Sequence, residues 1–571
     1  MKQPKVLILS LVLFALLLAG ASWVFRVAAN NAATEVKNVA KQVPFASARR
    51  FVQDLEYSFE DAQWWKSAVF YEIFVRSFYD SNGDGIGDLN GVTEKLDYLN
   101  DGNPATTDDL GVTALWLMPI FPSPSYHGYD VTDYYDVNPD YGTLDDLKTL
   151  LSEAHKRGIR VILDLVINHT SSEHPWFSAA QEPQNPFQDW YIWADSDPGY
   201  LGPWNEQVWH LAANGEYYYG VFWSGMPDLN LQNPEVTTEV EKIAQFWLTD
   251  VGVDGFRLDA ARHLIEDGKK QANTPATVQW LADFAAFDKH LSPSAMIVGE
   301  VWDSSYVTTG YIKSNSLDLV FDFDLSSAII NTVASRNAQG LASNVQNEVS
   351  LYQGGGMANF LTNHDMNRIM LQLGKNPDLM KHAATVLLTL PGTPFIYYGE
   401  EIGMLGMKPD EQIRTPMQWT SGEYAGFSSV MPWEPLDYSY KVSNVTAESA
   451  DEDSLLSFYR DLIRIRNSHP ALQQGQYYLL SSSDRDIYAA LAISDQDIVL
   501  VLMSFSKKPV SGVDLVFDGD LPAGNYFLVE MMGDQNLGGQ IVVPEEAGKP
   551  NFTISGTIEA DGNYVFDLVK Q

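Results

Sequence analysis

"TLDDLKTLLSEAHKRGIRVILDLVI", residues 143–167, contains the repeating unit that decides the fold. Thr143 precedes two acidic residues in the first turn of a helical pattern, and Gly158 follows its last turn. These residue types are typical of a helix start and a helix end. The run that follows, residues 160–167, is apolar and rich in β-branched side chains, as in a strand of a parallel sheet. The stretch therefore predicts one helix followed by one strand.

The same alternation of short apolar runs and longer helical patterns extends from about Ala68 to Pro470. Eight runs predict strands: AVFYEIFVRSF (68–78), ALWLMPI (114–120), RVILDLVI (160–167), VDGFRLDA (253–260), AMIVGEVW (295–302), LDLVFDFDL (317–325), MANFLTNHD (357–365) and PFIYYGEE (394–401). Strands that alternate with helices form parallel βα units. Eight such units predict an α/β fold, the closed (β/α)8 TIM barrel.

Two segments depart from this alternation. From His169 to about Asn230 the chain is rich in Trp, Tyr, Pro and Gly without a convincing helix. Because so long a structureless loop is uncommon, we expect a small inserted domain after strand three. From about Leu472, short strands separated by turn residues predict a C-terminal antiparallel β-sandwich. The predicted boundaries are 63–169 and 231–471 for the catalytic barrel, 170–230 for the inserted domain and 472–571 for the C-terminal β domain.

Charge and cysteine content restrict the classes of function. The 571 residues carry 36 basic against 74 acidic side chains, a net charge of −38. Such a surface repels nucleic acid, so we expect a neutral ligand and no nucleic-acid partner. We also expect a monomer. The chain has no cysteine, which excludes disulfides, zinc thiolates and thiol catalysis.

The N-terminus predicts export. Lys2 and Lys5 precede an uncharged run from Val6 to Phe25, and Ala19-Gly20-Ala21 offers a small-residue cleavage site. The run has the length of either a signal peptide or a membrane anchor. We therefore predict that residues 1–26 are one of these two and that residues 27–62 form a linker. The protein is then secreted or anchored on the outer face of the cytoplasmic membrane, with possible attachment only through this segment.

Polar side chains cluster at the predicted carboxyl ends of the strands, where the active sites of such barrels lie. They are Asp164, His169, Arg257, Asp259, Glu300, His364 and Asp365. For any one of them a structural ion pair is the simpler interpretation. Carboxylates and histidines from four strand ends that converge on one barrel mouth favour a catalytic site instead.

Two facing carboxylates are what the cleavage of a glycosidic bond needs. Arg257 shares a strand face with Asp259, because side chains alternate along a strand, and its charge should lower the pKa of this carboxyl. Glu300 follows an apolar strand, where burial should raise its pKa. The pattern predicts an ionised nucleophile, Asp259, and a protonated acid, Glu300.

Four segments carry a resemblance to a known family. DLVINH (164–169), GFRLDAARH (255–263), VGEVW (298–302) and FLTNHD (360–365) resemble, in order and spacing, the signature regions of the alpha-amylase family of glycoside hydrolases. The resemblance covers residues 64 to 571 and implies that Asp259 is the nucleophile, Glu300 the acid/base and Asp365 the third carboxylate, which holds sugar hydroxyls.

The resemblance also implies residues that bind the sugar. His169, His364 and Arg257 match polar residues of the family's signature regions, and YHGYD (126–130) resembles its first subsite. His127 and Tyr129 would line the cleaved sugar, with Asp130 behind them. RTPMQW (414–419) resembles the glucosidase branch and would place Arg414 near the sugar.

DSNGDGIGD, residues 80–88, starts like an EF-hand loop, but Gly91 replaces the glutamate at position twelve. An acidic turn without an ion is one interpretation. The stretch also resembles the calcium loop of the oligo-1,6-glucosidase branch. This resemblance implies a structural Ca²⁺ remote from the chemistry, held by Asp80, Asn82, Asp84, the carbonyl of Ile86 and Asp88.

SGMPDLN, residues 224–230, bears on specificity. It resembles a hybrid of the oligo-1,6-glucosidase and neopullulanase motifs. Family members with such a hybrid motif form an intermediate branch that includes exported bacterial alpha-amylases. Ala260 departs from the valine of α-1,6-specific enzymes, and Thr420 departs from the aspartate of strict glucosidases. We expect an exported, retaining hydrolase of the α-1,4 bonds of starch and maltodextrins.

Two alternatives remain. One is an α-glucosidase, oligo-1,6-glucosidase or transglycosylase that acts on short maltooligosaccharides. The other is an inactive relative that serves as a binding subunit, against which the presence of Asp259, Glu300 and Asp365 argues.

Overall fold

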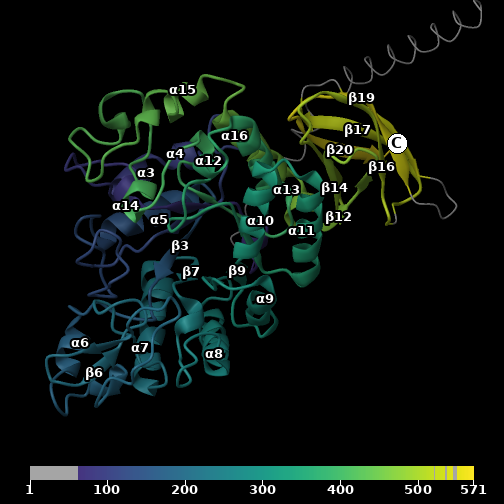
Figure 1. Ribbon diagram of the computed structural model, residues 1–571. Coiled ribbons are helices and arrows are strands. Elements are labelled where there is room, and N and C mark those ends of the chain that lie inside the picture. Colours follow the sequence, from purple (N-terminus) through teal and green to yellow (C-terminus); the bar gives the residue numbers. More distant parts are fainter. Residues whose placement is uncertain (1–61, 520, 534–536, 544–549, 571) are drawn as a thin grey trace, which may run out of the picture. The chain divides into compact units, whose positions relative to one another are not determined.

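Eight parallel strands close into a barrel in the computed structural model, which describes residues 62–519, 521–533, 537–543 and 550–570. Their bounds are β1 Phe70–Ile73, β2 Ala114–Leu117, β3 Arg160–Leu165, β7 Gly255–Leu258, β8 Met296–Gly299, β9 Leu319–Phe321, β10 Met357–Phe360 and β11 Thr393–Tyr397. Each neighbouring pair is parallel, and β1 closes the barrel against β11. The eight predicted strands are therefore confirmed (Figure 1).

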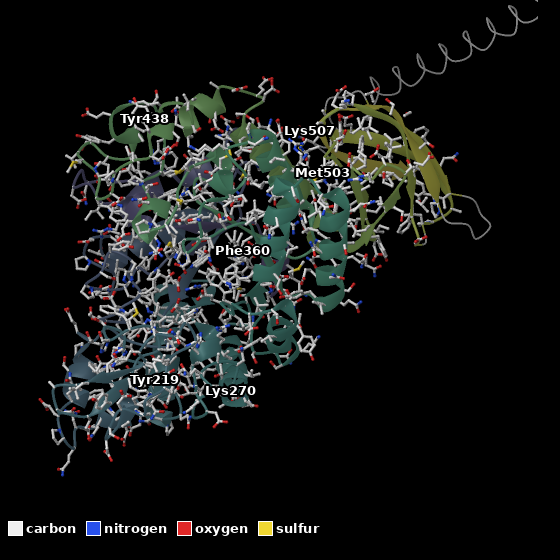
Figure 2. All side chains as sticks on the ribbon, in the orientation of Figure 1. Tyr219, Lys270, Phe360, Tyr438, Met503 and Lys507 are labelled. Atoms are coloured by element: carbon white, nitrogen blue, oxygen red, sulfur yellow. The ribbon has the colours of Figure 1, made fainter. Side chains whose placement is uncertain are left out.

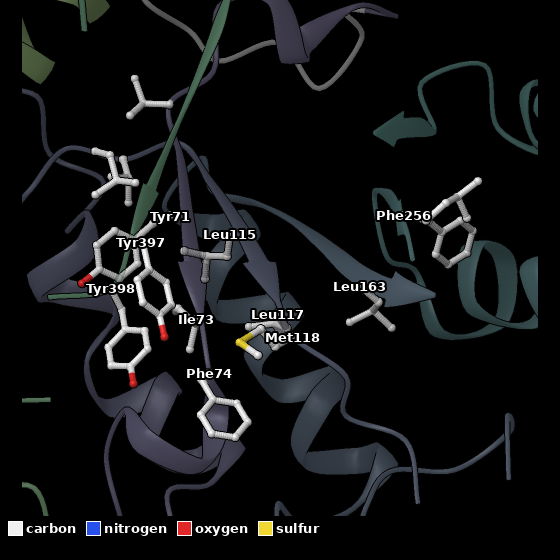
Figure 3. Packing of buried hydrophobic residues seen from close by; sticks show 14 of the residues in the cluster. Tyr71, Ile73, Phe74, Leu115, Leu117, Met118, Leu163, Phe256, Tyr397 and Tyr398 are labelled. Atoms are coloured by element: carbon white, nitrogen blue, oxygen red, sulfur yellow. The ribbon is translucent and has the colours of Figure 1, made fainter. Parts of the chain in front are cut away.

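Alternation along the strands separates two apolar layers. Phe70, Trp116, Ile162 and Phe360 belong to the cluster that fills the barrel, and Phe360 is labelled in Figure 2. The residues at the alternate positions of each strand point outward, into the layer beneath the helices. Figure 3 shows part of this layer: Tyr71, Ile73, Leu115, Leu117, Leu163, Phe256 and Tyr397. Burial of both faces explains why the strands read as continuous apolar runs.

The helices cover the outward layer. Helix α5 (Leu144–Lys156) begins at Thr143, whose side chain forms a reciprocal capping box with Asp146. Its buried residues include Leu147 and Leu150, and Gly158 takes the left-handed φ of +75° just beyond its end. The other long helices of the barrel are α7 Pro234–Gln245, α8 Pro275–Leu291, α9 Ser305–Lys313, α10 Phe323–Ala334, α11 Ala338–Leu351, α13 Pro377–Thr389 and α16 Leu455–Ser468.

A second sheet interrupts the barrel between β3 and β7. It has three short antiparallel strands, β4 Trp193–Ala194, β5 Trp209–Leu211 and β6 Tyr217–Tyr219, in the order β4-β6-β5. The expectation of no helix in this segment is wrong at one place, because α6 spans Pro175–Ala180. His174 accepts a hydrogen bond from the backbone N–H of Trp176, and Pro175 fits the first helical turn.

The C-terminal region packs two antiparallel sheets around a separate core. One sheet has the order β12-β14-β15-β20-β17-β18 and the other β13-β16-β19. Their strands are β12 Gln476–Leu479, β13 Ser481–Ser482, β14 Ile487–Ile493, β15 Ile498–Ser504, β16 Val510–Val516, β17 Gly524–Met532, β18 Gln540–Val543, β19 Asn551–Ile558 and β20 Asn563–Lys570. The hydrogen bond between His382 Nδ1 and Asn563 Oδ1, 2.7 Å long, ties this region to α13.

Contacts divide the chain into residues Met1–Tyr57 and a compact unit, Ser58–Gln571, that holds both the barrel and the C-terminal sheets. The predicted signal or anchor at residues 1–26, and all of the linker 27–62 except its last residue, lie outside the described residues. In the part that is described, no helix is both long and apolar enough to cross a membrane.

Candidate active site

One guanidinium gathers carboxylates from three strand ends. Arg257 Nη1 lies 2.8 Å from Asp164 Oδ1 and 2.7 Å from Asp259 Oδ1, and its Nη2 lies 2.9 Å from Glu300 Oε2. The guanidinium is 1% exposed and sits over the Trp116 ring, 5.2 Å from its centroid. Residues from β3, β7 and β8 are therefore brought to one point by a buried arginine, which confirms their predicted convergence.

The turn after β7 adds a contact between the backbone next to Asp259 and the carboxyl group of Glu300. Ala260 follows Asp259 with a left-handed φ of +49°, which is uncommon for a residue with a side chain. This turn points the Ala260 N–H at Glu300 Oε2, 3.1 Å away. Backbone strain at this position is therefore used to fix Glu300 relative to Asp259.

The pKa of Asp259 differs from the sequence expectation. Burial raises it, and the charge of Arg257 counteracts this rise without taking the pKa below its ordinary value. The expected net lowering is wrong because Arg257 is shared among three carboxylates and because Asp365 adds negative charge. The expected direction is confirmed for Glu300, whose pKa burial raises.

Asp365, after β10, is the ionised member of the group. Burial acts to raise its pKa, but the charges of His364 and Arg414 outweigh burial and lower the pKa to about 2. Arg414 donates from Nη2 to Asp365 Oδ1 at 2.8 Å and from Nε to the His364 carbonyl at 2.9 Å. The structure thus brings Arg414 to the same pocket, as the sequence predicted.

The surroundings of His364 favour its charged form. Its Nδ1 lies 2.5 Å from Glu72 Oε1, and its Nε2 lies 2.7 Å from the Tyr129 hydroxyl. Burial acts to lower the pKa of His364, but the charges of Asp365 and Glu72 prevail and raise it. Glu72 was missed by the sequence analysis, although a lone charge inside the apolar run FYEIF is a visible signal.

The aromatic segment after β2 lines the other side of the pocket. The Tyr129 hydroxyl donates to Asp164 Oδ2 at 3.0 Å, and the Tyr129 carbonyl lies 3.0 Å from His169 Nε2. Burial lowers the pKa of His169 to about 4, so this ring is neutral at pH 7. The Tyr129 N–H donates to His127 Nδ1 at 3.1 Å, which fixes the His127 ring beside Tyr129.

Asp130 lies behind this wall, as expected. It is 5% exposed and accepts hydrogen bonds from the hydroxyls of Ser123 and Ser125. Its contacts therefore shape the loop that presents His127 and Tyr129.

Asp164 was predicted at a strand end without a defined role. Burial raises its pKa to about 7 in spite of its contact with Arg257. Its oxygens bind Arg257 and Tyr129, so it orients both of these side chains. Of the predicted site residues, the structure brings all ten of the catalytic and substrate-binding set into one connected group around the ends of β2, β3, β7, β8 and β10.

Known proteins resemble this chain closely. Residues 72–475 match the model of the alpha amylase catalytic domain. "Alpha-amylase 3" of Dictyoglomus thermophilum is 44% identical over 446 residues, which are 77% of this chain and 85% of that protein. The crystal structure of an alpha-amylase from H. orenii is 43% identical, with a TM-score of 0.77 over 88% of this chain and 100% of the other.

The chain belongs to the alpha-amylase family. It is a glycoside hydrolase of that family, with the family's barrel and C-terminal sheets. An "Oligo-1,6-glucosidase" of Parageobacillus thermoglucosidasius is also similar, at 34% identity over 525 residues, 78% of this chain and 91% of that protein. Relatives of different specificity therefore share this scaffold.

The predicted calcium loop of this alpha-amylase family member is an oxygen-lined turn between β1 and α3 (Leu89–Glu94). Asp80 and Asp88 are buried, and they accept backbone N–H groups of Gly85 at 2.8 Å and Gly91 at 2.7 Å. The donor types of Asp80, Asn82, Asp84, Ile86 and Asp88 fit Ca²⁺, which prefers oxygen. No group of three His, Cys, Asp or Glu residues in the described ranges is placed to hold a metal, so calcium stays a prediction.

Proposed function

We propose that this alpha-amylase family enzyme hydrolyses the α-1,4 bonds of starch, maltodextrins and related α-glucans with retention of anomeric configuration. Asp259 is the nucleophile, Glu300 the acid/base and Asp365 the carboxylate that holds sugar hydroxyls. His127, Tyr129, His169, His364 and Arg414 line the sugar that is cleaved.

One observation carries this proposal. Arg257 binds Asp259 at 2.7 Å and Glu300 at 2.9 Å, so both carboxyl groups are held on the same guanidinium and face one pocket. Retaining glycosidases need their two carboxyl groups about 5 to 5.5 Å apart, which is the span a single guanidinium can serve.

In the first step, the Glu300 proton passes to the glycosidic oxygen. The Asp259 carboxylate forms a bond to the anomeric carbon as the bond to that oxygen breaks, and the shortened glucan leaves with the proton. The raised pKa of Glu300 favours its protonated form before this step, and Arg257 stabilises its carboxylate afterwards.

In the second step, the Glu300 carboxylate takes a proton from water. The water oxygen bonds to the anomeric carbon and releases Asp259, so two inversions give net retention. Asp365 stays ionised throughout because its pKa is about 2, and the raised pKa of His364 favours a positive charge beside it.

Product analysis tests the proposal. We expect soluble starch and maltotriose to be hydrolysed with the α-anomer appearing first by NMR. Pocket shape alone discriminates neighbouring linkages by about 1 to 3 kcal/mol, so maltotriose should be cleaved about ten- to two-hundredfold faster than isomaltose. Isomaltose cleaved as fast as maltotriose would contradict the α-1,4 assignment.

A second candidate is an oligo-1,6-glucosidase or transglycosylase that acts on short oligosaccharides. The 34% identity to the oligo-1,6-glucosidase favours it, together with the contact of Arg414 with Asp365. Panose and pullulan distinguish an α-1,6-specific enzyme from an α-1,4-specific one. The α-1,6-specific enzyme releases glucose and maltose from panose and leaves pullulan uncut at its α-1,4 bonds, whereas α-1,4 cleavage of panose gives isomaltose and glucose.

We also propose that the loop of residues 80–88 holds a structural Ca²⁺. Its five oxygen donors support the proposal, and so do the buried carboxylates of Asp80 and Asp88. A metal that binds only the folded state stabilises it, so a chelator should lower the melting temperature. In Asp84→Ala, whose aspartate is exposed, the chelator should have no further effect. An unchanged calcium dependence in this variant would place the ion elsewhere.

Export is proposed from residues 1–26 alone. Cell fractionation with N-terminal sequencing tests it: a shortened chain in the medium indicates cleavage, and an intact chain in the membrane fraction indicates an anchor. An intact chain in the cytoplasm would contradict both.

A further inference from the structure

A cavity of about 480 Å³ opens where the inserted domain meets the segment that follows β7. Five aromatic side chains line it: Tyr191, Trp193, Tyr200, Trp209 and Tyr219. Ligand pockets commonly have volumes of about 300 to 1,000 Å³ with aromatic walls and a few polar groups. The cavity shares no lining residue with the carboxylate site described above.

The rings are fixed in place before any ligand arrives. The centroids of Tyr200 and Trp209 are 6.1 Å apart, and those of Trp209 and Tyr219 are 5.4 Å apart. Tyr219, labelled in Figure 2, is buried and donates its hydroxyl to Gln271 Oε1 at 3.1 Å. Rings that are ordered in advance lose little entropy when a ligand packs on them.

Polar groups with spare hydrogen-bonding capacity surround the rings. The Asp189 carboxylate makes no hydrogen bond or ion pair within the described ranges of the chain, while its backbone carbonyl accepts from Asn230 Nδ2 at 3.0 Å. Burial raises the pKa of Glu266 to about 7, so this carboxyl both donates and accepts near neutral pH.

These groups select the class of ligand. The lining residues of the cavity include the carboxyl groups of Asp189 and Glu266 but no lysine or arginine, and the nearby Lys269 ammonium lies over the Tyr200 ring, 5.7 Å from its centroid. Two acidic groups in the lining disfavour phosphate, sulfate and other anions. A neutral sugar offers one apolar face of C–H groups for an aromatic ring and a rim of hydroxyls for carboxyl and amide oxygens. The aromatic rings and the polar groups of the cavity therefore both fit a carbohydrate.

Gln271 connects the cavity to the barrel mouth. It accepts from the Tyr219 hydroxyl, donates to the Leu201 carbonyl at 2.9 Å and places its own carbonyl 2.8 Å from His263 Nδ1. His263 follows the Asp259 turn and packs against Trp204, whose ring is 57% exposed. A chain bound in the cavity would lie close to the rim of the catalytic pocket.

We propose that this cavity binds a glucosyl segment of an α-glucan chain outside the catalytic centre and keeps a polymer next to the barrel mouth. The identity of the sugar rests on the proposed function. The test therefore measures binding to starch separately from the hydrolysis of maltotriose.

Insoluble starch granules provide the probe, with the full chain in solution. In Asp189→Ala/Tyr200→Ala, the fraction retained on granules should fall about five- to tenfold, since a ring and one hydrogen bond to a sugar contribute roughly 1 to 1.4 kcal/mol. Turnover of maltotriose should stay within a factor of two, because neither substituted residue belongs to the carboxylate site. Tyr306→Ala is the matched control, because it removes an 81% exposed ring on α9, outside the cavity.

Three results would overturn the proposal: unchanged retention in the double variant, an equal loss in Tyr306→Ala, or release of bound protein by choline at concentrations where maltose releases none. The last would indicate an ammonium ligand. Because Tyr200 packs on Trp209, Asp189→Ala alone must also reduce retention while its melting temperature stays that of the wild type. A failure of the proposed function is distinguishable from a failure of the cavity proposal, because in that case the wild type would not hydrolyse maltotriose.

Discussion

Carboxylates stand at the ends of the barrel strands in two contrasting settings. After β7 and β8, Asp259 and Glu300 lie against the guanidinium of Arg257. After β11, phenolic hydroxyls donate to both glutamates, from Tyr459 to Glu400 at 2.8 Å and from Tyr71 to Glu401 at 2.7 Å. The Oε2 atoms of both glutamates are buried and have no hydrogen-bond partner among the described residues.

The difference shows that strand-end position alone does not make a carboxylate catalytic. Burial raises the pKa of Glu400 to about 8, because the Tyr459 hydroxyl and the charge of Arg368 offset the loss of water only in part. The same burial acts on Asp259, where Arg257 counteracts it. An arginine that shares the pocket of Asp259, the proposed nucleophile, therefore favours the ionised form of this buried carboxyl.

Substitution of either proposed catalytic carboxyl group should have the largest effect. We expect Asp259→Asn and Glu300→Gln each to lower kcat by at least about a thousandfold, because each removes a group that forms or protonates a bond. Circular dichroism and melting temperature should be close to those of the wild type. Asp283→Asn, on the exposed face of α8, is the control. More than a few per cent of residual activity in either variant contradicts the assigned roles.

Arg257→Lys should have the next largest effect. A lysine keeps the charge but cannot hold three carboxylates at once, so kcat should fall about a hundredfold or more and the pKa of Asp259 should rise. In the pH–rate profile the acidic limb, which reports ionisation of the nucleophile, should move to higher pH. An unmoved acidic limb would mean that Arg257 does not control Asp259.

Glu72→Gln tests the charge on His364. Loss of the carboxylate should lower the pKa of His364, so the imidazolium loses its proton at lower pH. We expect about a tenfold lower kcat/KM, with the loss growing as pH rises. Glu94→Gln, an exposed glutamate on α3, should leave the profile unchanged. A loss that is independent of pH would indicate a purely structural role for Glu72.

Glu400→Gln should raise the stability of the protein at high pH, in contrast to the losses of activity expected from the variants above. A folded-state pKa of about 8 lies above the ordinary value of 4.5, so the wild type loses stability as pH rises between these two values. The amide keeps an acceptor for Tyr459 without a charge to bury. Melting temperature at pH 9 should therefore be several degrees higher in the variant, with little difference at pH 4. A variant that is less stable at pH 9 contradicts this account.

The smallest effect is expected from Ala260→Val. A β-branched residue at φ +49° costs about 1 to 3 kcal/mol, which should appear as a small drop in melting temperature. The side chain also fills space beside Asp259, so the preference for maltotriose over isomaltose should narrow. A wider preference would mean that Ala260 does not shape the pocket.

Much of this arrangement could be predicted from sequence because it depends on local patterns. Alternating strands and helices predicted the barrel, and strand-end polar residues predicted the convergence of Asp259, Glu300 and Asp365. The sequence could not show that Arg257 is shared with Asp164, because this depends on which strands are neighbours. Glu72 was missed for the same reason, since its partner His364 lies 292 residues away. The pKa of Asp259 depends on burial, which a single strand does not reveal.

Trapping the covalent intermediate tests the central claim most directly. A 5-fluoro-glucosyl fluoride reacts in the first step and slows the second, so the sugar should remain bonded to the enzyme. Mass spectrometry of the digested enzyme should place the sugar on the peptide that contains Asp259, and Asp259→Asn should carry none. A sugar bonded to Glu300 or Asp365, or an enzyme that turns over this reagent without any adduct and gives the β-anomer first, would contradict the account.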